Sequence, residues 1–86
     1  MENEEVKRLI EAGIADAQVT VNGDGSHYEA IVVGAVFAGK SLLEKQKMVY
    51  ATLNAEITSG RIHALSIKAY SPEEWEKAQK FQVGGA

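Results

Sequence analysis

Two histidines carry the widest range of chemistry in this 86-residue chain. His63 comes just before a stretch of alternating apolar residues, and His27 lies in a glycine-rich loop. An imidazole with a reference pKa of about 6.5 is partly neutral near physiological pH. Such a side chain can ligate a metal, transfer a proton or hydrogen-bond a partner, so the surrounding residues have to decide between these roles.

Catalysis by either histidine has little support in the sequence. No serine or cysteine nucleophile motif accompanies them. The acidic residues that stand out, Glu44, Glu73 and Glu74, fall at expected helix starts, where capping explains them. A general acid–base enzyme built on His63 lacks a partner residue, and we expect a protein that is not an enzyme.

A metal site made by this chain alone is also not expected. The chain has no cysteine, and two histidines supply at most two of the four ligands that zinc or an iron pair requires. A site shared with another protein is chemically reasonable, because imidazole can replace thiolate on one iron of a [2Fe–2S] cluster.

Composition predicts one small folded domain over residues 1–81, followed by a flexible tail over 82–86. Hydrophobic residues make up 45% of the chain and charged residues 24%. The acidic N-terminus and the lack of a long apolar run predict a soluble cytoplasmic protein without a membrane segment.

The charge of the chain disfavours nonspecific binding to a phosphate backbone, because the net charge is −3 and the isoelectric point is near 5.3. A local basic surface remains an alternative nucleic-acid site. Its candidate residues are Lys40, Lys45, Lys47, Arg61 and Lys68.

The first half of the chain reads as a helix and a hairpin. Asn3 is placed to cap a helix that ends at Gly13, which we expect in a left-handed conformation. Alternating apolar residues predict a strand over 15–21 and a second over 28–33, joined by the turn at 22–25.

The second half reads as a helical region, a strand and a helix. Ser41 and Glu44 match a capping box that opens the helical region, which Ser59-Gly60 ends and which we expect to break near Glu44. Its expected buried stripe is Leu43, Val49, Tyr50, Leu53 and Ile57.

The last strand, over 65–70, places His63 in its apolar phase, at the end of the core face. Ser71-Pro72-Glu73-Glu74 then caps a final helix. The expected inward side of that helix is Trp75, Ala78, Gln79 and Phe81.

These elements assemble into an α+β fold with a small mixed three-stranded sheet. The tight first turn requires an antiparallel pair, and the helical connection requires a parallel pair joined by a right-handed crossover. Helices packed on one face of the sheet then give two layers.

Three segments together resemble the BolA family. They are Phe37–Leu43, Ile62–Leu65 and Ser71–Trp75, and residues 23–28 and 61–70 are similar to its bacterial IbaG-like branch. The resemblance implies the order α-β-β-α-α-β-α, a fold similar to a type II KH domain, which supports a divided central helix.

The resemblance also implies a function. BolA-like proteins pair with monothiol, CGFS-type glutaredoxins and share a glutathione-containing [2Fe–2S] cluster, in iron–sulfur cluster trafficking, iron homeostasis and stress response. By position, the signature histidine of the family corresponds to His63, and the variable ligand loop corresponds to His27. The isolated chain is expected to carry no cofactor and to be a monomer or a weak homodimer.

The alternative implied by the family is a DNA-binding regulator of morphology and stress genes. Three observations weigh against it. The chain is acidic, it has Lys45-Gln46-Lys47 where better-known members have Arg-His-Arg, and it has no Gly-x-x-Gly loop of the kind with which KH domains clamp nucleic acid.

Overall fold

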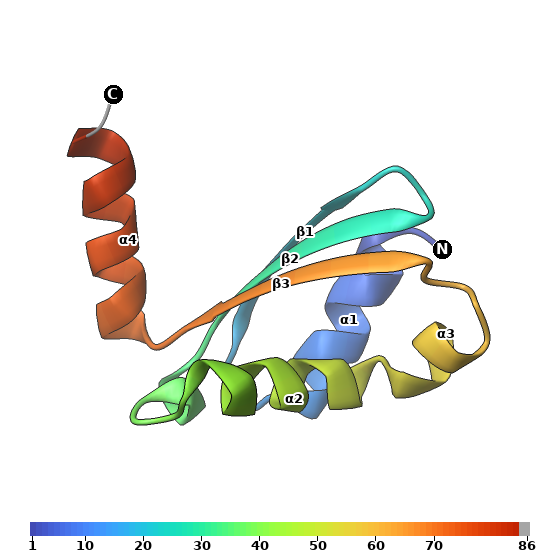
Figure 1. Ribbon diagram of the computed structural model, residues 1–86, viewed down its shortest axis with the longest axis horizontal. Coiled ribbons are helices and arrows are strands. Elements are labelled where there is room, and N and C mark those ends of the chain that lie inside the picture. The colour runs from blue at the N-terminus through green and yellow to red at the C-terminus, as the bar shows by residue number, and fades with distance from the viewer. Residues whose placement is uncertain (85–86) are drawn as a thin grey trace.

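The computed structural model describes residues 1–84, with side chains through residue 80, and confirms the expected order of elements. Four helices, three strands and one short 3-10 helix follow one another (Figure 1). Their bounds are α1 Asn3–Gly13, β1 Gln18–Gly23, β2 His27–Val33, η1 Ala35–Phe37, α2 Leu42–Thr52, α3 Asn54–Thr58, β3 Ala64–Tyr70 and α4 Pro72–Gly84. Helix α4 thus extends to Gly84, three residues into the segment expected as a tail, and residues 85–86 lie outside the described part.

The sheet is mixed, as expected, with the strand order β1-β2-β3. β1 pairs antiparallel with β2, and β2 pairs parallel with β3. A turn at Asp24 and Gly25 makes the first connection, and the positive φ of Gly25, 103°, suits a residue without a side chain. The second connection is the crossover that contains η1, α2 and α3.

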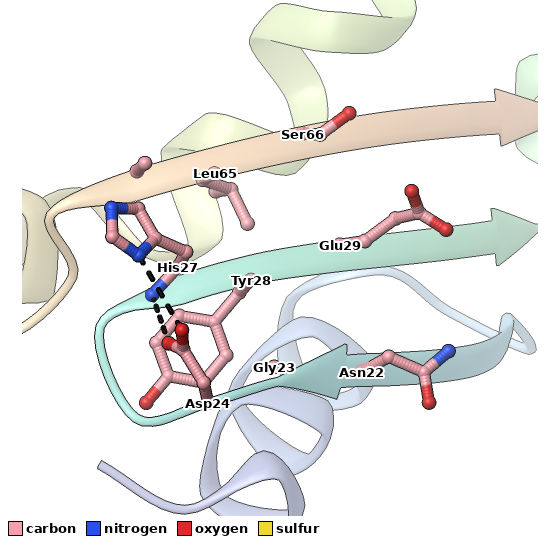
Figure 2. Close-up of a pocket in the computed structure, with 9 residues that line it drawn as sticks. Asn22, Gly23, Asp24, His27, Tyr28, Glu29, Leu65 and Ser66 are labelled. Atoms are coloured by element: carbon pink, nitrogen blue, oxygen red, sulfur yellow. Dashed lines mark hydrogen bonds and ion pairs between the residues drawn. The ribbon is translucent and has the colours of Figure 1, made fainter.

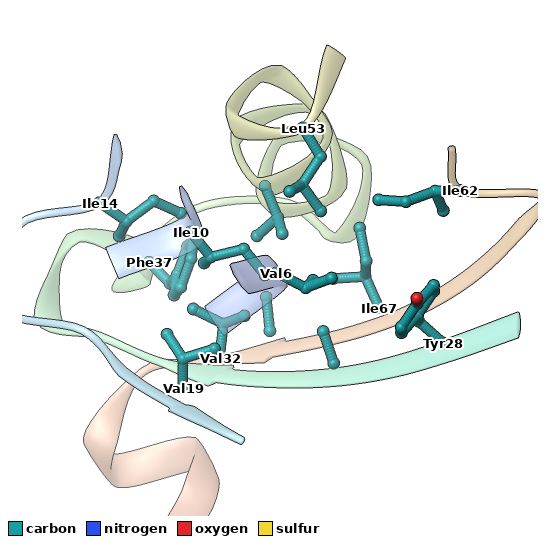
Figure 3. Packing of buried hydrophobic residues seen from close by; sticks show 13 residues of the cluster. Val6, Ile10, Ile14, Val19, Tyr28, Val32, Phe37, Leu53, Ile62 and Ile67 are labelled. Atoms are coloured by element: carbon teal, nitrogen blue, oxygen red, sulfur yellow. The ribbon is translucent and has the colours of Figure 1, made fainter. Parts of the chain in front are cut away.

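One face of the sheet carries the hydrophobic core. Alternate strand residues, among them Val19, Val32 and Ile67, point into a layer formed by α1 and α2 (Figure 3). Phe37 of η1 and Leu53 are fully buried in the same cluster.

The opposite surface of the sheet, which we call the open face, is mostly polar. Its members are Gln18, Thr20 and Asn22 of β1, His27, Glu29, Ile31 and Val33 of β2, and Ala64, Ser66, Lys68 and Tyr70 of β3. Most of these side chains are exposed, so the face offers surface rather than core.

Helix α4 stands beyond the end of β3, away from the α1 and α2 layer (Figure 1). The expected capping box is confirmed, because Ser71 and Glu74 exchange hydrogen bonds of 2.8 and 3.2 Å. The Trp75 ring packs at a tilt against Tyr70, with 5.3 Å between the centroids. On its expected inward side, Trp75 and Ala78 are half-buried and Gln79 is exposed, while the side chain of Phe81 lies outside the described residues.

The central helix divides at Leu53, so the prediction of a break near Glu44 was wrong in position. Leu53 leaves the helical conformation, with φ −118° and ψ 14°, and its side chain is fully buried. After the bend, α3 has no fully buried residue, and Ile57 packs against the core while partly exposed.

The predicted buried stripe of the central helix was wrong at two positions. Leu43 is 63% exposed and Tyr50 is 39% exposed. Val49 and Leu53 are buried as expected, and Lys45 takes the remaining inward place in the first turns of α2.

The ends of α1 also differ from the prediction. Glu2 rather than Asn3 precedes the helix, and its N–H donates to the Glu5 carboxylate at 3.2 Å. Gly13 is helical, and the left-handed residue is Asp16, with φ 57°. Because that turn comes first, β1 starts at Gln18 rather than at Ala15.

Gly13 is required for a close approach between α1 and α2. A Cβ atom at Gly13 would lie 2.5 Å from Cγ2 of Thr52 and 3.1 Å from its Cβ. The Thr52 hydroxyl donates to the Val49 carbonyl at 2.7 Å, which fixes the rotamer and leaves the methyl group facing Gly13.

We therefore expect Gly13→Ala to lower the free energy of unfolding by about 1–3 kcal/mol through overpacking. Alanine for glycine inside a helix otherwise adds roughly 1 kcal/mol of stability. Adding Thr52→Ser removes the methyl group but keeps the hydroxyl, so the double variant should recover most of the loss. Urea unfolding followed by far-ultraviolet circular dichroism measures both, with Thr52→Ser alone as the control. A Gly13→Ala variant as stable as the wild type would contradict this packing.

Candidate functional site

The backbones of His27 and His63 meet at one end of the sheet. His27 is the first residue of β2 and pairs with Ala64, the first residue of β3. The N–H groups of His63 and Ala64 both donate to the Ser26 carbonyl, at 3.1 and 3.2 Å. The hairpin and the loop before β3 are thereby joined at the base of both histidines.

Asp24 stabilises the hairpin turn that precedes His27 through hydrogen bonds with the backbone. Its Oδ1 accepts from the N–H groups of Ser26, at 3.1 Å, and His27, at 2.9 Å, and its own N–H donates to the His27 carbonyl at 3.2 Å. The hydrogen bond from the His27 N–H, followed by that from Ser26, lowers the pKa of Asp24 from 3.8 to about 2. Asp24 is therefore a permanent negative charge beside His27 over the physiological pH range.

The Asp24 carboxylate also faces the imidazole of His27. Nδ1 of His27 lies 3.6 Å from Oδ2 of Asp24, and the His27 side chain is 70% exposed. Figure 2 shows the other ring nitrogen pointing away from Asp24, on the side of the start of β3. A carboxylate on that side favours the proton on Nδ1, which leaves Nε2 free to ligate or to accept a hydrogen bond.

A concave surface of about 660 Å³ lies beside His27. The side chains of Asn22, Glu29 and Ser66 on the open face line it together with the hairpin (Figure 2). Polar side chains from all three strands therefore line the open surface on which the exposed imidazole lies.

His63 is exposed, so the prediction that it ends the core face was wrong. β3 begins one residue later, at Ala64, and the buried residue at this end is Ile62. The period-two pattern of the strand does not extend to His63, because this residue lies in the bend before the ladder. Its side chain is consequently accessible to a partner.

The potential metal ligands of this chain are imidazoles and carboxylates, because it has no cysteine. Within the described residues, no group of three or more His, Cys, Asp and Glu side chains could hold a metal ion. His27 and His63 are both exposed and their backbones are joined, so two imidazoles are accessible at this end of the sheet.

Lys45 is not available to a nucleic acid. Its side chain is only 8% exposed, and Nζ lies 2.8 Å from both carboxylate oxygens of Glu74. The bond to Lys45 and then the bond from the Ser71 N–H lower the pKa of Glu74 from 4.5 to about 2. Lys45 therefore ties α2 to the start of α4.

The structure does not gather the other candidate basic residues on one surface. Lys40 and Lys47 are exposed before and on α2, and Lys68 is on the open face. Arg61 pairs with Glu5 of α1 at 3.5 Å.

Sequence reasoning missed two contributors to these sites. Asp24 was assigned to the turn alone, although its spacing of three residues from His27 allows the contact that orients the ring. Glu74 was assigned to capping alone, and its second partner, Lys45, is 29 residues away. No local signal marks that pair.

Comparison with known proteins identifies the neighbours of this chain. A family model described as BolA-like protein matches residues 7–74. The acid stress protein IbaG of Escherichia coli strain K12 is 45% identical over 80 residues, covering 93% of this chain and 95% of the relative. The DNA-binding transcriptional regulator BolA of the same strain is 39% identical over 57 residues, covering 66% of this chain and 53% of the relative.

Solved structures agree with the sequence matches. A bolA protein homologue from Coxiella burnetii has a TM-score of 0.80 at 38% identity, covering 88% of this chain and 97% of the homologue. The BolA domain of SufE1 from Arabidopsis thaliana has a TM-score of 0.74 at 28% identity, covering 84% and 93%. No catalytic family is indicated by these matches, and no described helix is long and apolar enough to cross a membrane.

The pair of Lys45 and Glu74 gives a stability prediction. We expect Glu74→Gln to lower the free energy of unfolding at pH 7 by about 1–2 kcal/mol, because a nearly buried ammonium loses its partner while the partly exposed carboxylate is screened by water. The folded-state pKa is lowered, so this stabilisation is complete above about pH 4.5 and is lost as the pH falls towards 2.

Urea unfolding by circular dichroism between pH 7 and pH 2 measures this effect. The difference between wild type and Glu74→Gln should shrink across the window from 4.5 to 2. Glu73→Gln is the matched control, since Glu73 lies in the same first turn without Lys45 beside it. A difference that stays constant with pH would argue against the pair.

Proposed function

Because this chain belongs to the BolA family, we propose that it is a partner protein that binds a monothiol glutaredoxin and contributes imidazole ligands to a shared [2Fe–2S] cluster. The observation that carries the proposal is the placement of two exposed histidines, His63 and His27, whose backbones meet at the Ser26 carbonyl. BolA-family proteins are regulators or partner proteins rather than enzymes, and the comparisons indicate no catalytic family.

The sulfur ligands have to come from the partner. This chain has no cysteine, whereas a monothiol glutaredoxin and its glutathione each supply a thiolate. His63, at the signature position, is the first ligand candidate and His27 is the second. The chemistry that the cluster would supply is labile iron–sulfur ligation, suited to transfer or sensing.

The residues around His27 support its role as a ligand. The ionised Asp24 faces Nδ1 and leaves Nε2 directed away from the hairpin. A carboxylate behind a ligating imidazole orients the ring. Asp24 is thus a positioning residue for His27 in this proposal.

The proposal connects this site to iron homeostasis and stress response. A protonated imidazole cannot ligate iron, so ligation by histidine is sensitive to acid. One relative carries the name acid stress protein, which is consistent with a site of this kind.

The proposal predicts that mixing this protein anaerobically with a cluster-loaded monothiol glutaredoxin gives a new visible absorption and circular dichroism spectrum. We expect His63→Ala to abolish the new spectrum, since it removes the first candidate ligand. His27→Ala should shift the spectrum and speed loss of the cluster. Thr20→Ala, a change of an exposed open-face residue outside the concave surface beside His27, should behave like the wild type.

Binding of the glutaredoxin without the cluster, measured by calorimetry, separates loss of a ligand from loss of the partner. If both histidine variants gave wild-type spectra and wild-type cluster lifetimes, ligation by these residues would be ruled out. If mixing the wild-type protein with the glutaredoxin gave no spectral change, the proposal of a shared cluster would be contradicted.

A second candidate function is DNA binding, which the similarity to the transcriptional regulator BolA supports over 57 residues. On this chain Lys45 is buried against Glu74, so the exposed lysines before and on α2 that remain candidates are Lys40 and Lys47. The dispersal of the remaining basic side chains makes this the weaker candidate.

DNA binding predicts an affinity that falls steeply with salt concentration, because phosphate contacts release counterions. Lys47→Ala should weaken it and reduce the salt slope by about 1, with Lys68→Ala as the control on the other surface. Fluorescence anisotropy at several salt concentrations measures both. Absent or salt-independent binding would exclude this use of the lysines.

A further inference from the structure

The outer edge of β1 is an unprotected strand edge. β1 is the first strand in the sheet order, and its other side pairs with β2 (Figure 1). Within the described residues, no hydrogen bond from a helix, a loop or a side chain reaches the outward groups of this strand.

The register identifies which backbone groups point outward. Asp24 donates to the His27 carbonyl, which marks a hydrogen-bonded pair at the base of the hairpin. Because the pairing alternates along an antiparallel ladder, Asn22, Thr20 and Gln18 also bond to β2. The N–H and C=O groups of Val19, Val21 and Gly23 are therefore directed away from the sheet.

The opposite edge of the sheet is covered in part. The carbonyls of Leu65 and Ile67 in β3 accept hydrogen bonds from side chains of α2, namely Tyr50 at 3.3 Å and Gln46 at 2.7 Å. A strand that pairs with β3 would have to displace these contacts. In the described part of the chain, no hydrogen bond of this kind lies along β1.

β1 also lacks the usual protection against pairing. Its sequence, Gln-Val-Thr-Val-Asn-Gly, contains no charge and no proline, and β-branched residues occupy its centre. Exposed edges are commonly blunted by lysine, proline, bulges or inward-pointing charges. A neutral strand can lie against an identical strand without like charges opposing each other.

We infer that β1 pairs antiparallel with β1 of a second copy, about a two-fold axis at Val21. This register places Thr20 opposite Asn22 of the second copy and Asp24 opposite Gln18. A two-fold axis at Thr20 would instead bring Asp24 opposite Asp16, a like-charge contact that disfavours it. Charge therefore favours the axis at Val21 over the axis at Thr20.

The pairing joins two sheets into one continuous sheet, with both helical layers on the same side. Opposed residues in an antiparallel pair lie on the same face, so the open faces also become continuous. One short strand per copy buries little surface, so the dimer is weak and forms at high protein concentration. His63 lies next to β3, at the edge of the sheet opposite to this contact.

Sedimentation equilibrium on the chain alone tests the association. We expect an apparent mass that rises with concentration and returns to that of the monomer in Thr20→Lys/Asn22→Lys, which opposes lysines across the axis. The matched control is Ala64→Lys/Ser66→Lys, with the same added charge on the same face but on β3, and it should associate like the wild type.

Disulfide cross-linking of introduced cysteines tests the register. The chain has no native cysteine, so no other thiol competes in this experiment. Cβ atoms of a directly opposed, non-hydrogen-bonded pair lie roughly 4.5–5.5 Å apart, close enough for a disulfide after a small adjustment. A mixture of Thr20→Cys and Asn22→Cys chains should cross-link several-fold faster than a mixture of Thr20→Cys and Ser66→Cys chains, as scored by mass spectrometry.

Three outcomes would overturn the inference. They are a monomer at every concentration up to about 1 mM, association that persists in Thr20→Lys/Asn22→Lys, and equal cross-linking in the two mixtures. These measurements need no glutaredoxin and no iron, so their result is independent of the proposed function.

Discussion

The parallel pairing of β2 with β3 is the constraint on which the rest of the structure depends. Parallel strands begin at the same end of a sheet, so the first residue of β2 and the residue before β3 must come together. The crossover between them has to carry the chain back, and its helices supply half of the layer that covers the core. The same pairing thus brings His27 and His63 together and closes the hydrophobic interior.

Most of the fold could be predicted because its signals are local. The turn at Asp24 and Gly25, the cap at Ser71 and the alternation in β3 each lie within a few residues, and each is present in the structure. The burial of Lys45 could not be predicted, because its partner comes from another helix and a lysine ordinarily marks a solvent-facing position. The break at Leu53 likewise depends on how the helix meets the core rather than on a glycine or proline.

For the candidate site, the sequence indicated the residue types, with His63 just before the last strand and His27 in the hairpin loop, but not that the two backbones meet. The sequence did not indicate whether the histidine side chains are accessible to a partner. The strand pattern extrapolated to His63 predicts an inward side chain, whereas the ladder starts one residue later and leaves it exposed. The orientation of His27 depends on a carboxylate fixed by two backbone N–H groups, and only the folded hairpin shows that geometry.

The way α4 is attached affects how unfolding of this protein would be observed. Three described contacts hold the helix, and all fall in its first turn: the Lys45 pair, the Ser71 cap and the tilted packing of Trp75 against Tyr70. Such an element can open locally at a lower free energy than the core. Trp75 is the single tryptophan of the chain, so intrinsic fluorescence would report undocking of α4 before the sheet melts. A fluorescence melting curve would then underestimate the stability of the domain.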